Sequence, residues 1–147
     1  MINKNNIFGL FEDKNNISIH DIVNAPKDFL NSPIAQLGMF TKLIGNHELF
    51  HKKLEKFLKQ EKKVIDIEET KEASALSVYN RAWYYINKID LSCKEDYYAL
   101  LDFKPSPIIN ALNKAIFYFE NKEEYEKCAK LLEIKNLKEN LEKGLPI

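Results

Sequence analysis

The sequence has little of what marks several large classes of protein. Of its 147 residues only four are glycine and five proline, so it is neither collagenous nor of low complexity. No stretch approaches the roughly 18 consecutive apolar residues of a membrane-spanning helix. The first residues, Met1 to Asn6, do not lead into the apolar core of a signal peptide. We therefore expect a soluble, cytoplasmic protein with no membrane partner.

Cysteine is scarce as well. Cys93 and Cys128 are the two cysteines of the chain, and no Cys-x-x-Cys pair occurs. The absence of such a pair excludes a thiolate zinc site and a thioredoxin-type redox motif. Without a signal peptide, two separate cysteines are typical of reduced thiols that pack as small apolar side chains. A disulfide or a catalytic thiol is the less favoured alternative.

Arginine is nearly absent, because Arg81 is the single arginine among 22 basic residues. Arginine is the side chain best suited to bidentate contacts with phosphates and guanine edges. The 22 basic residues are balanced by 22 acidic ones, so the chain has no excess charge with which to bind nucleic acid. Nucleic acid is thus an unlikely partner. The bias toward Lys, Asn and Ile suggests an AT-rich genome, such as that of a low-GC bacterium or its phages.

The zero net charge conceals an uneven distribution. Residues 1–63 have ten Lys and seven acids, and residues 64–147 have twelve basic and fifteen acidic residues, which gives +3 and −3. Two interpretations remain open: complementary packing of the two halves, or of two copies, and a solvated lysine-rich helix face, which we favour. A nucleic-acid-associated protein that uses this face is a third functional hypothesis. The basic excess lies at Lys52, Lys53, Lys56, Lys59, Lys62 and Lys63.

Apolar residues recur at helical spacing along most of the chain. The pattern predicts an all-α fold and one domain over residues 1–147: an irregular segment with short helices over 1–31, then a bundle of about five main helices over 32–147. Short helices are expected over 3–11 and 19–25, with a lone strand near Ile17 as the alternative for the second. The main helices are expected over 34–61, 66–90, 92–103, 107–121 and 123–141.

Capping patterns predict where these helices begin and end. Gly45 and Asn46 are expected to kink or interrupt the first main helix. Gly144 has the position of a residue that ends the last one. The second main helix is expected to bury a stripe that starts at Leu76 and includes Tyr79 and Trp83. The expected N-terminal capping residues are Ser32, Asp66, Ser92 and Ser106.

One short motif indicates chemistry. Residues 47–51 read His-Glu-Leu-Phe-His, a formal match to the HExxH motif of zinc metalloproteases. The resemblance implies that His47 and His51 bind zinc while Glu48 activates the bound water. A small zinc-dependent hydrolase, with zinc as its cofactor, is therefore the alternative function.

Three features weigh against the zinc interpretation. A catalytic zinc needs a third protein ligand, and the remaining histidine, His20, lies upstream of the motif. Lys52 and Lys53 follow directly, where the helix of a metalloprotease is usually uncharged, and no sheet is indicated. We favour two partly buried histidines that are hydrogen-bonded to side chains such as Tyr or Glu, with no cofactor.

Aromatic residues are concentrated in the second half of the chain, where eleven of the 17 lie between Tyr79 and Tyr125. Those that cannot all face a core are typical of protein interfaces. The sequence therefore favours a non-enzymatic protein–protein interaction or assembly module, acting as a homo-oligomer or as an accessory or structural component of a larger phage or bacterial complex. Its expected interaction surface comprises Tyr84, Tyr85, Tyr98, Tyr118, Lys52, Lys53, Lys56 and Lys59.

Overall fold

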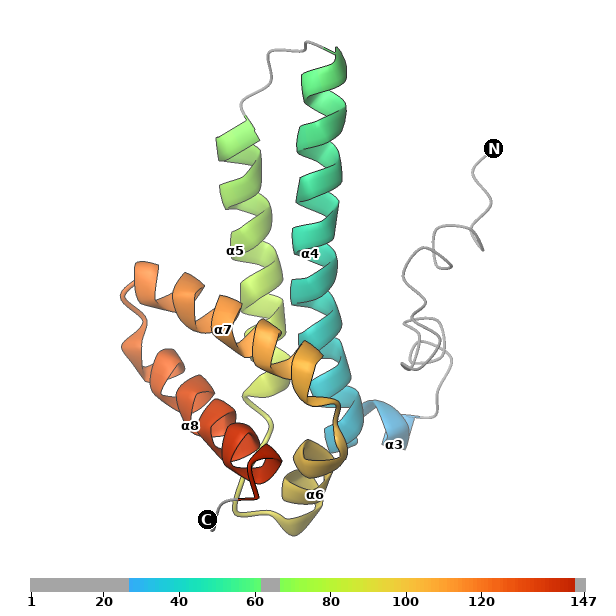
Figure 1. Ribbon diagram of the computed structural model, residues 1–147, viewed down its shortest axis with the longest axis vertical. Coiled ribbons are helices and arrows are strands. Elements are labelled where there is room, and N and C mark those ends of the chain that lie inside the picture. Colours follow the sequence, from blue (N-terminus) through green and yellow to red (C-terminus); the bar gives the residue numbers. More distant parts are fainter. Residues whose placement is uncertain (1–26, 62–66, 145–147) are drawn as a thin grey trace.

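The computed structural model describes residues 27–61 and 67–144, and within them it contains helices and no strand (Figure 1). The all-α prediction and its count of about five main helices are confirmed, with one short helix, α3, before them. The short elements expected over 3–11 and 19–25 lie outside the described residues, as does the expected cap Asp66. The helices are α3 (Lys27–Leu30), α4 (Pro33–Glu61), α5 (Ile67–Ile86), α6 (Lys94–Asp102), α7 (Pro105–Asn121) and α8 (Tyr125–Glu142).

The start of α4 follows the sequence closely. Ser32 Oγ accepts a hydrogen bond from the Ala35 amide at 3.3 Å, and the Ser32 carbonyl accepts one from the Gln36 amide at 3.1 Å. Ser32 is thus the predicted N-cap, and Pro33 occupies the first helical position, where a missing N–H costs nothing. The interruption expected at Gly45 is wrong, since α4 is continuous for 29 residues. A single helical glycine costs about 1 kcal/mol, which so long a helix tolerates.

Two predicted helix starts are wrong. The Ser92 hydroxyl donates to Asp90 Oδ1 at 2.6 Å, so it is not free to cap α6, whose N-cap is Cys93. Helix α7 begins at Pro105, two residues before the predicted start at Pro107. Both prolines fit in the first turn because the amides of that turn have no helical acceptor.

Positive backbone φ angles occur in the turn of the C-terminal hairpin, which α7 and α8 form, and directly after its last helix. The turn between α7 and α8 contains Glu123 at φ 59°, and Gly144 follows α8 at φ 64°. Gly144 has no Cβ that would disfavour this left-handed conformation, so it ends the helix as predicted. The short turn makes α7 and α8 antiparallel neighbours (Figure 1).

The hydrophobic core lies at one end of the α4–α5 hairpin. From α4 it contains Leu37, Phe40 and Ile44, all in the N-terminal half of that helix. Leu76 is 52% exposed, so its predicted place in the core stripe of α5 is wrong. The remaining core residues come from the C-terminal part of α5 and from the segments after it: Ala82, Ile86, Ile89, Leu100, Ile108, Ala111, Leu112, Ala115, Phe119, Leu131 and Ile134.

The far end of the α4–α5 hairpin extends beyond the other helices as an arm (Figure 1). Helix α7 crosses α4 and pairs with α8, while α6 packs against α4 and α8. The 29 residues of α4 span about 43 Å, against about 26 Å for the 17 residues of α7. In the described part of the chain, the C-terminal half of α4 therefore has α5 as its main partner and two sides without a closely packed helix. No helix in the described ranges is long and apolar enough to cross a bilayer.

A lysine occupies a core position that the sequence pattern does not reveal. Lys138 of α8 is fully buried, and its Nζ donates to the carbonyls of Leu101 and Phe103 at 2.9 and 2.6 Å. These carbonyls lie at the C-terminal end of α6, where the helix dipole favours a cation. Glu142 pairs with the same ammonium at 3.0 Å. Lys138 therefore joins α8 to the end of α6.

Replacing Lys138 by methionine is expected to lower the free energy of unfolding by about 2–4 kcal/mol, because the carbonyls of Leu101 and Phe103 lose their donor. Urea denaturation measures this change. Lys135→Met is the control, since Lys135 forms a more exposed pair with Glu139 at 3.9 Å and is expected to cost under about 1 kcal/mol. Equal effects of the two substitutions would contradict the role assigned to Lys138.

Candidate functional site

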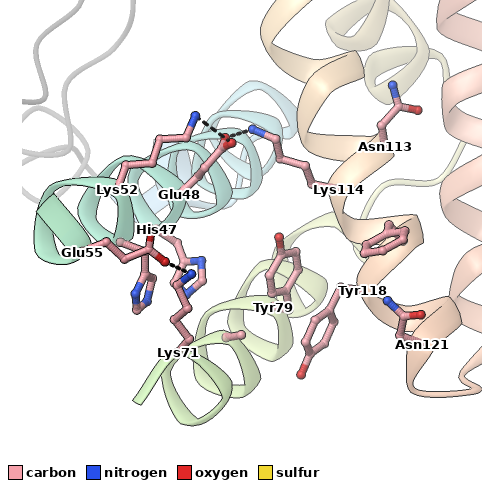
Figure 2. Close-up of a pocket in the computed structure, with 13 residues that line it drawn as sticks. His47, Glu48, Lys52, Glu55, Lys71, Tyr79, Asn113, Lys114, Tyr118 and Asn121 are labelled. Carbon is pink, nitrogen blue, oxygen red and sulfur yellow. Dashed lines mark ion pairs between the residues drawn. The ribbon is translucent and has the colours of Figure 1, made fainter. Parts of the chain in front are cut away.

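A cleft of about 720 Å³ opens where α7 crosses the α4–α5 hairpin. Helix α4 contributes both histidines and Glu48, and α5 contributes Lys71 and Tyr79. The polar and aromatic side chains that line the third side come from α7: Asn113, Lys114, Phe117, Tyr118 and Asn121. Figure 2 shows Lys114 of α7 facing Glu48 across this opening. The volume is in the range of small-molecule sites. The HELFH motif therefore lies in the wall of this cleft.

The two motif histidines share one hydroxyl group. Ser74 Oγ of α5 lies 2.6 Å from His51 Nε2 and 3.3 Å from His47 Nε2. The two rings meet edge to face at 4.4 Å, and the His47 ring also contacts Tyr79 at 5.9 Å. The expected burial and side-chain bonding of the pair are thus observed, but the partner is a serine, which the sequence analysis missed.

One protonation pattern satisfies all three contacts of the Ser74 hydroxyl group. The Ser74 hydroxyl has one proton, and Ser74 Oγ donates to the Lys71 carbonyl at 3.1 Å. The hydroxyl oxygen is then left to accept from both histidines, so each ring has its hydrogen on Nε2. His51 Nδ1 becomes an acceptor, buried and without a hydrogen-bond partner among the described residues. In this arrangement His51 does not act as a base toward Ser74, and the cluster links α4 to α5.

Both histidines are held in the neutral form. Burial lowers the pKa of His51, and the nearby Lys71 ammonium lowers it further. Burial likewise lowers the pKa of His47, with a smaller contribution from His51. A second proton on the buried His51 ring would have no acceptor among the described residues. The neutral pair therefore stabilises the contact between α4 and α5 at neutral pH.

The zinc alternative requires a third ligand near this pair. Across residues 27–61 and 67–144, no three His, Cys, Asp or Glu side chains are grouped so that they could hold a metal ion. Glu48 instead pairs with Lys52 at 3.2 Å and with Lys114. His20 lies outside the described residues. The described donors thus consist of two histidines whose Nε2 atoms are both directed to Ser74.

The ion pairs that connect α4 to α5 and α7 are not the ones that the net charges of the two halves of the chain would suggest. Glu48 pairs with Lys114 of α7, and Glu55 pairs with Lys71 of α5 (Figure 2). In both pairs the acid comes from the basic half of the chain and the lysine from the acidic half. Complementary packing of the halves would pair the lysines of α4 with later acids. In these two contacts α4 therefore supplies the acid and its neighbours supply the lysine.

Aromatic side chains form the base of the cleft. Tyr79 and Tyr118 stack with ring centroids 4.2 Å apart and planes 7° from parallel (Figure 2). Burial raises the pKa of both phenols. The Tyr118 hydroxyl is buried and has no hydrogen-bond partner among the described residues. Phe117 lies beside it and is 67% exposed. Tyr118 is therefore part of the cleft rather than of an outer surface.

The other predicted interaction residues lie elsewhere. Tyr84 and Tyr98 are 52% and 58% exposed, on α5 and α6 respectively. Tyr85 is partly buried against the core, in contact with Tyr84. The four predicted tyrosines thus come from three helices, and they differ in exposure. Exposed residues of the arm include the four predicted lysines of α4: Lys52, Lys53, Lys56 and Lys59.

The histidine pair predicts a pH-dependent stability. Because the folded pKa values lie below 6.5, the unfolded chain binds more protons in acid. The free energy of unfolding is expected to be greatest above pH 6.5 and to fall as the pH decreases from there toward the folded pKa values. Replacing both His47 and His51 by Gln, which retains an N–H donor for Ser74, should remove this component. Urea denaturation between pH 5 and 8 measures it, and identical pH profiles for both proteins would refute it.

The geometry also predicts the outcome of a metal test. With Glu48 paired to lysines and both Nε2 atoms directed to Ser74, we expect purified protein to contain far less than one zinc per chain. Its melting temperature is expected to be unchanged by EDTA. Elemental analysis and a melting curve on the same sample provide the measurement. Stoichiometric zinc that is lost on replacing His51 by Gln would instead establish the metalloenzyme alternative.

Two features of the described surface combine exposed apolar side chains with lysines: the cleft and the outer side of the arm. Neither a protein-family model, nor a curated protein, nor a solved structure matches the chain. The chemistry of the cleft and of the arm is therefore the basis for a functional proposal.

Proposed function

We propose that the protein is a non-enzymatic interaction module whose α4 arm binds an acidic amphipathic helix of a partner protein. The supporting observation is one face of α4 on which large apolar side chains are exposed among lysines. Leu49, Phe50 and Phe57 are 42%, 58% and 52% exposed. Lys53 and Lys56 are exposed beside them. We refer to these five residues as the arm face.

The spacing of these residues places them on one side of the helix. Phe50, Lys53 and Phe57 follow each other in steps of three and four residues, and Leu49, Lys53 and Lys56 do the same. The opposite side of α4 carries His51 and Leu58, which are buried. The arm face is therefore held outward by packing on the other side of the same helix.

The charge of the arm face is of one sign. Between residues 49 and 60 the single acid is Glu55, which points away from this face to pair with Lys71. Exposed aromatic side chains at the centre of a patch are typical of binding hot spots, and charges around them direct partner choice. A partner helix with apolar residues every three or four positions and Asp or Glu beside them would satisfy both features.

A protein partner is favoured over nucleic acid or membrane. The arm face has two lysines and no arginine, whereas sequence-independent nucleic-acid binding needs an extended basic groove. The chain as a whole has no net charge to attract it to an anionic bilayer. Three large apolar side chains within nine residues instead resemble the compact anchor set of a helix-binding surface.

Synthetic peptides test the proposal directly. Two helical peptides share an identical Leu and Phe stripe, and one has Glu and the other Lys on its flanks. We expect the Glu peptide to bind in fluorescence anisotropy, with an affinity that falls as salt is raised, and the Lys peptide to bind at least tenfold more weakly. Equal binding of the two peptides would overturn the charge argument.

Substitutions locate the binding surface. Replacing both Phe50 and Phe57 by Ser is expected to weaken binding of the Glu peptide at least tenfold, and Lys53→Gln about threefold. Tyr98→Ser is the matched control, since Tyr98 is as exposed as Phe50 but lies on α6. Loss of binding in the Tyr98 variant alone would show that the peptide binds near α6 and not at the arm face.

The same protein variants test whether the arm face binds something other than a partner helix. Sedimentation velocity at high concentration reports self-association, and binding to anionic vesicles or single-stranded DNA reports the remaining alternatives. Tight binding to vesicles or DNA through Phe50 and Phe57, with none to the Glu peptide, would replace the protein partner. A dimer that dissociates on substitution of Phe50 and Phe57 would make a second copy the occupant.

A further inference from the structure

We propose that the cleft between the arm and α7 is a binding site for a small organic anion with an aromatic body. This inference goes beyond the proposed interaction with a partner helix, because it involves the opposite side of α4. It depends on three observations: the size and position of the cleft, its aromatic base, and the lysines at its edge.

The position of the cleft follows from the crossing of the helices. Helix α7 crosses the α4–α5 hairpin, and the arm extends beyond it (Figure 1). The open corner between α4, α5 and α7 is the cleft. The corner measures about 720 Å³ and is lined from all three helices. A volume of this size holds a molecule of one or two aromatic rings with substituents.

The base of the corner suits a flat apolar body. The stacked rings of Tyr79 and Tyr118, the small side chain of Ala75 and the exposed ring of Phe117 all line it. Phe117 is the most exposed large apolar side chain in the described part of the chain, at 67%. An aromatic ligand that covers Phe117 would remove this surface from water and gain ring contacts of about 0.5–1.5 kcal/mol each.

The edge of the corner favours a negative group. Three lysines, Lys52, Lys71 and Lys114, line the cleft against two acids, Glu48 and Glu55. Glu48 is shared between Lys52 and Lys114, so these two ammonium groups have one carboxylate between them (Figure 2). A carboxylate, sulfonate or phosphate on the ligand would pair with the excess positive charge there.

The neutral histidine pair does not alter the preference of the cleft for a negative group. His47 and His51 line the same cleft and contribute no charge in the neutral form that their burial favours. The positive charge that the ligand meets therefore comes from the lysines at the edge. The asparagines Asn113 and Asn121 of α7 add neutral donors and acceptors along one side.

The probe for this site is 8-anilinonaphthalene-1-sulfonate, which has two aromatic groups and one sulfonate. We expect saturable binding to the folded protein at one per chain, measured by fluorescence and calorimetry. Amide shifts in NMR spectra are expected to cluster at Lys71, Ala75, Phe117 and Asn121. The uncharged analogue N-phenyl-1-naphthylamine is expected to bind at least fivefold more weakly. Equal affinity of the two probes would overturn the anionic part of the proposal.

Paired variants assign the site. Phe117→Ser is expected to weaken binding at least fivefold, while Tyr125→Ser, at a residue that is 64% exposed outside the cleft, stays within twofold. Lys114→Gln is expected to weaken binding at least threefold, and Lys135→Gln, at an ion-paired lysine of α8, to leave it unchanged.

A second set of outcomes separates this site from the arm face. If replacing Phe50 and Phe57 by Ser abolishes binding of the probe while Phe117→Ser does not, the probe binds the arm face and the cleft proposal fails. All variants change exposed or partly exposed side chains, and circular dichroism verifies that each is folded. Peptide binding to the arm face is measured on the same proteins, so either proposal can fail without the other.

Discussion

The architecture depends on a mismatch in helix length. Helix α4 has 29 residues, but the helices that pack across it, α6 and α7, have 9 and 17. A common core can therefore include α4 only as far as Ile44, and beyond it the described buried residues of α4 are His51 and Leu58. Among the described residues α5 is the main partner of this second half, so two sides of the arm are without a closely packed helix. The cleft and the arm face are these two sides.

Where the core ends, a polar cluster joins the helices. A hydroxyl shared by two neutral histidines and ion pairs to α5 and α7 take the place of apolar packing around His51. Surface ion pairs contribute little each, whereas a buried hydrogen bond is costly to lose. Ser74 therefore matters more to the join than the lysine–glutamate pairs around it. This explains how a sequence with a metalloprotease-like motif uses its histidines for packing between helices.

The periodicity of the sequence was sufficient for the class of fold and for most helix bounds. It predicted α4 to within a residue because Ser32 and Pro33 define its start locally. It failed at Leu76, since an apolar stripe does not tell which neighbouring helix extends far enough to cover it. It also failed at Lys138 and Ser74, whose partners lie on other helices. Such contacts are between segments distant in sequence, and no local pattern encodes them.

Contacts between segments distant in sequence also explain why the outer side of the arm is basic. The acids of α4 near the cleft, Glu48 and Glu55, are used by lysines of α7 and α5. Lys53 and Lys56 point to the other side of the helix, where between residues 49 and 60 there is no acid to meet them. The balanced sequence is thus divided by the fold into a paired inner side and a basic outer side. A chain with no net charge can in this way present a local charge strong enough to select an acidic partner.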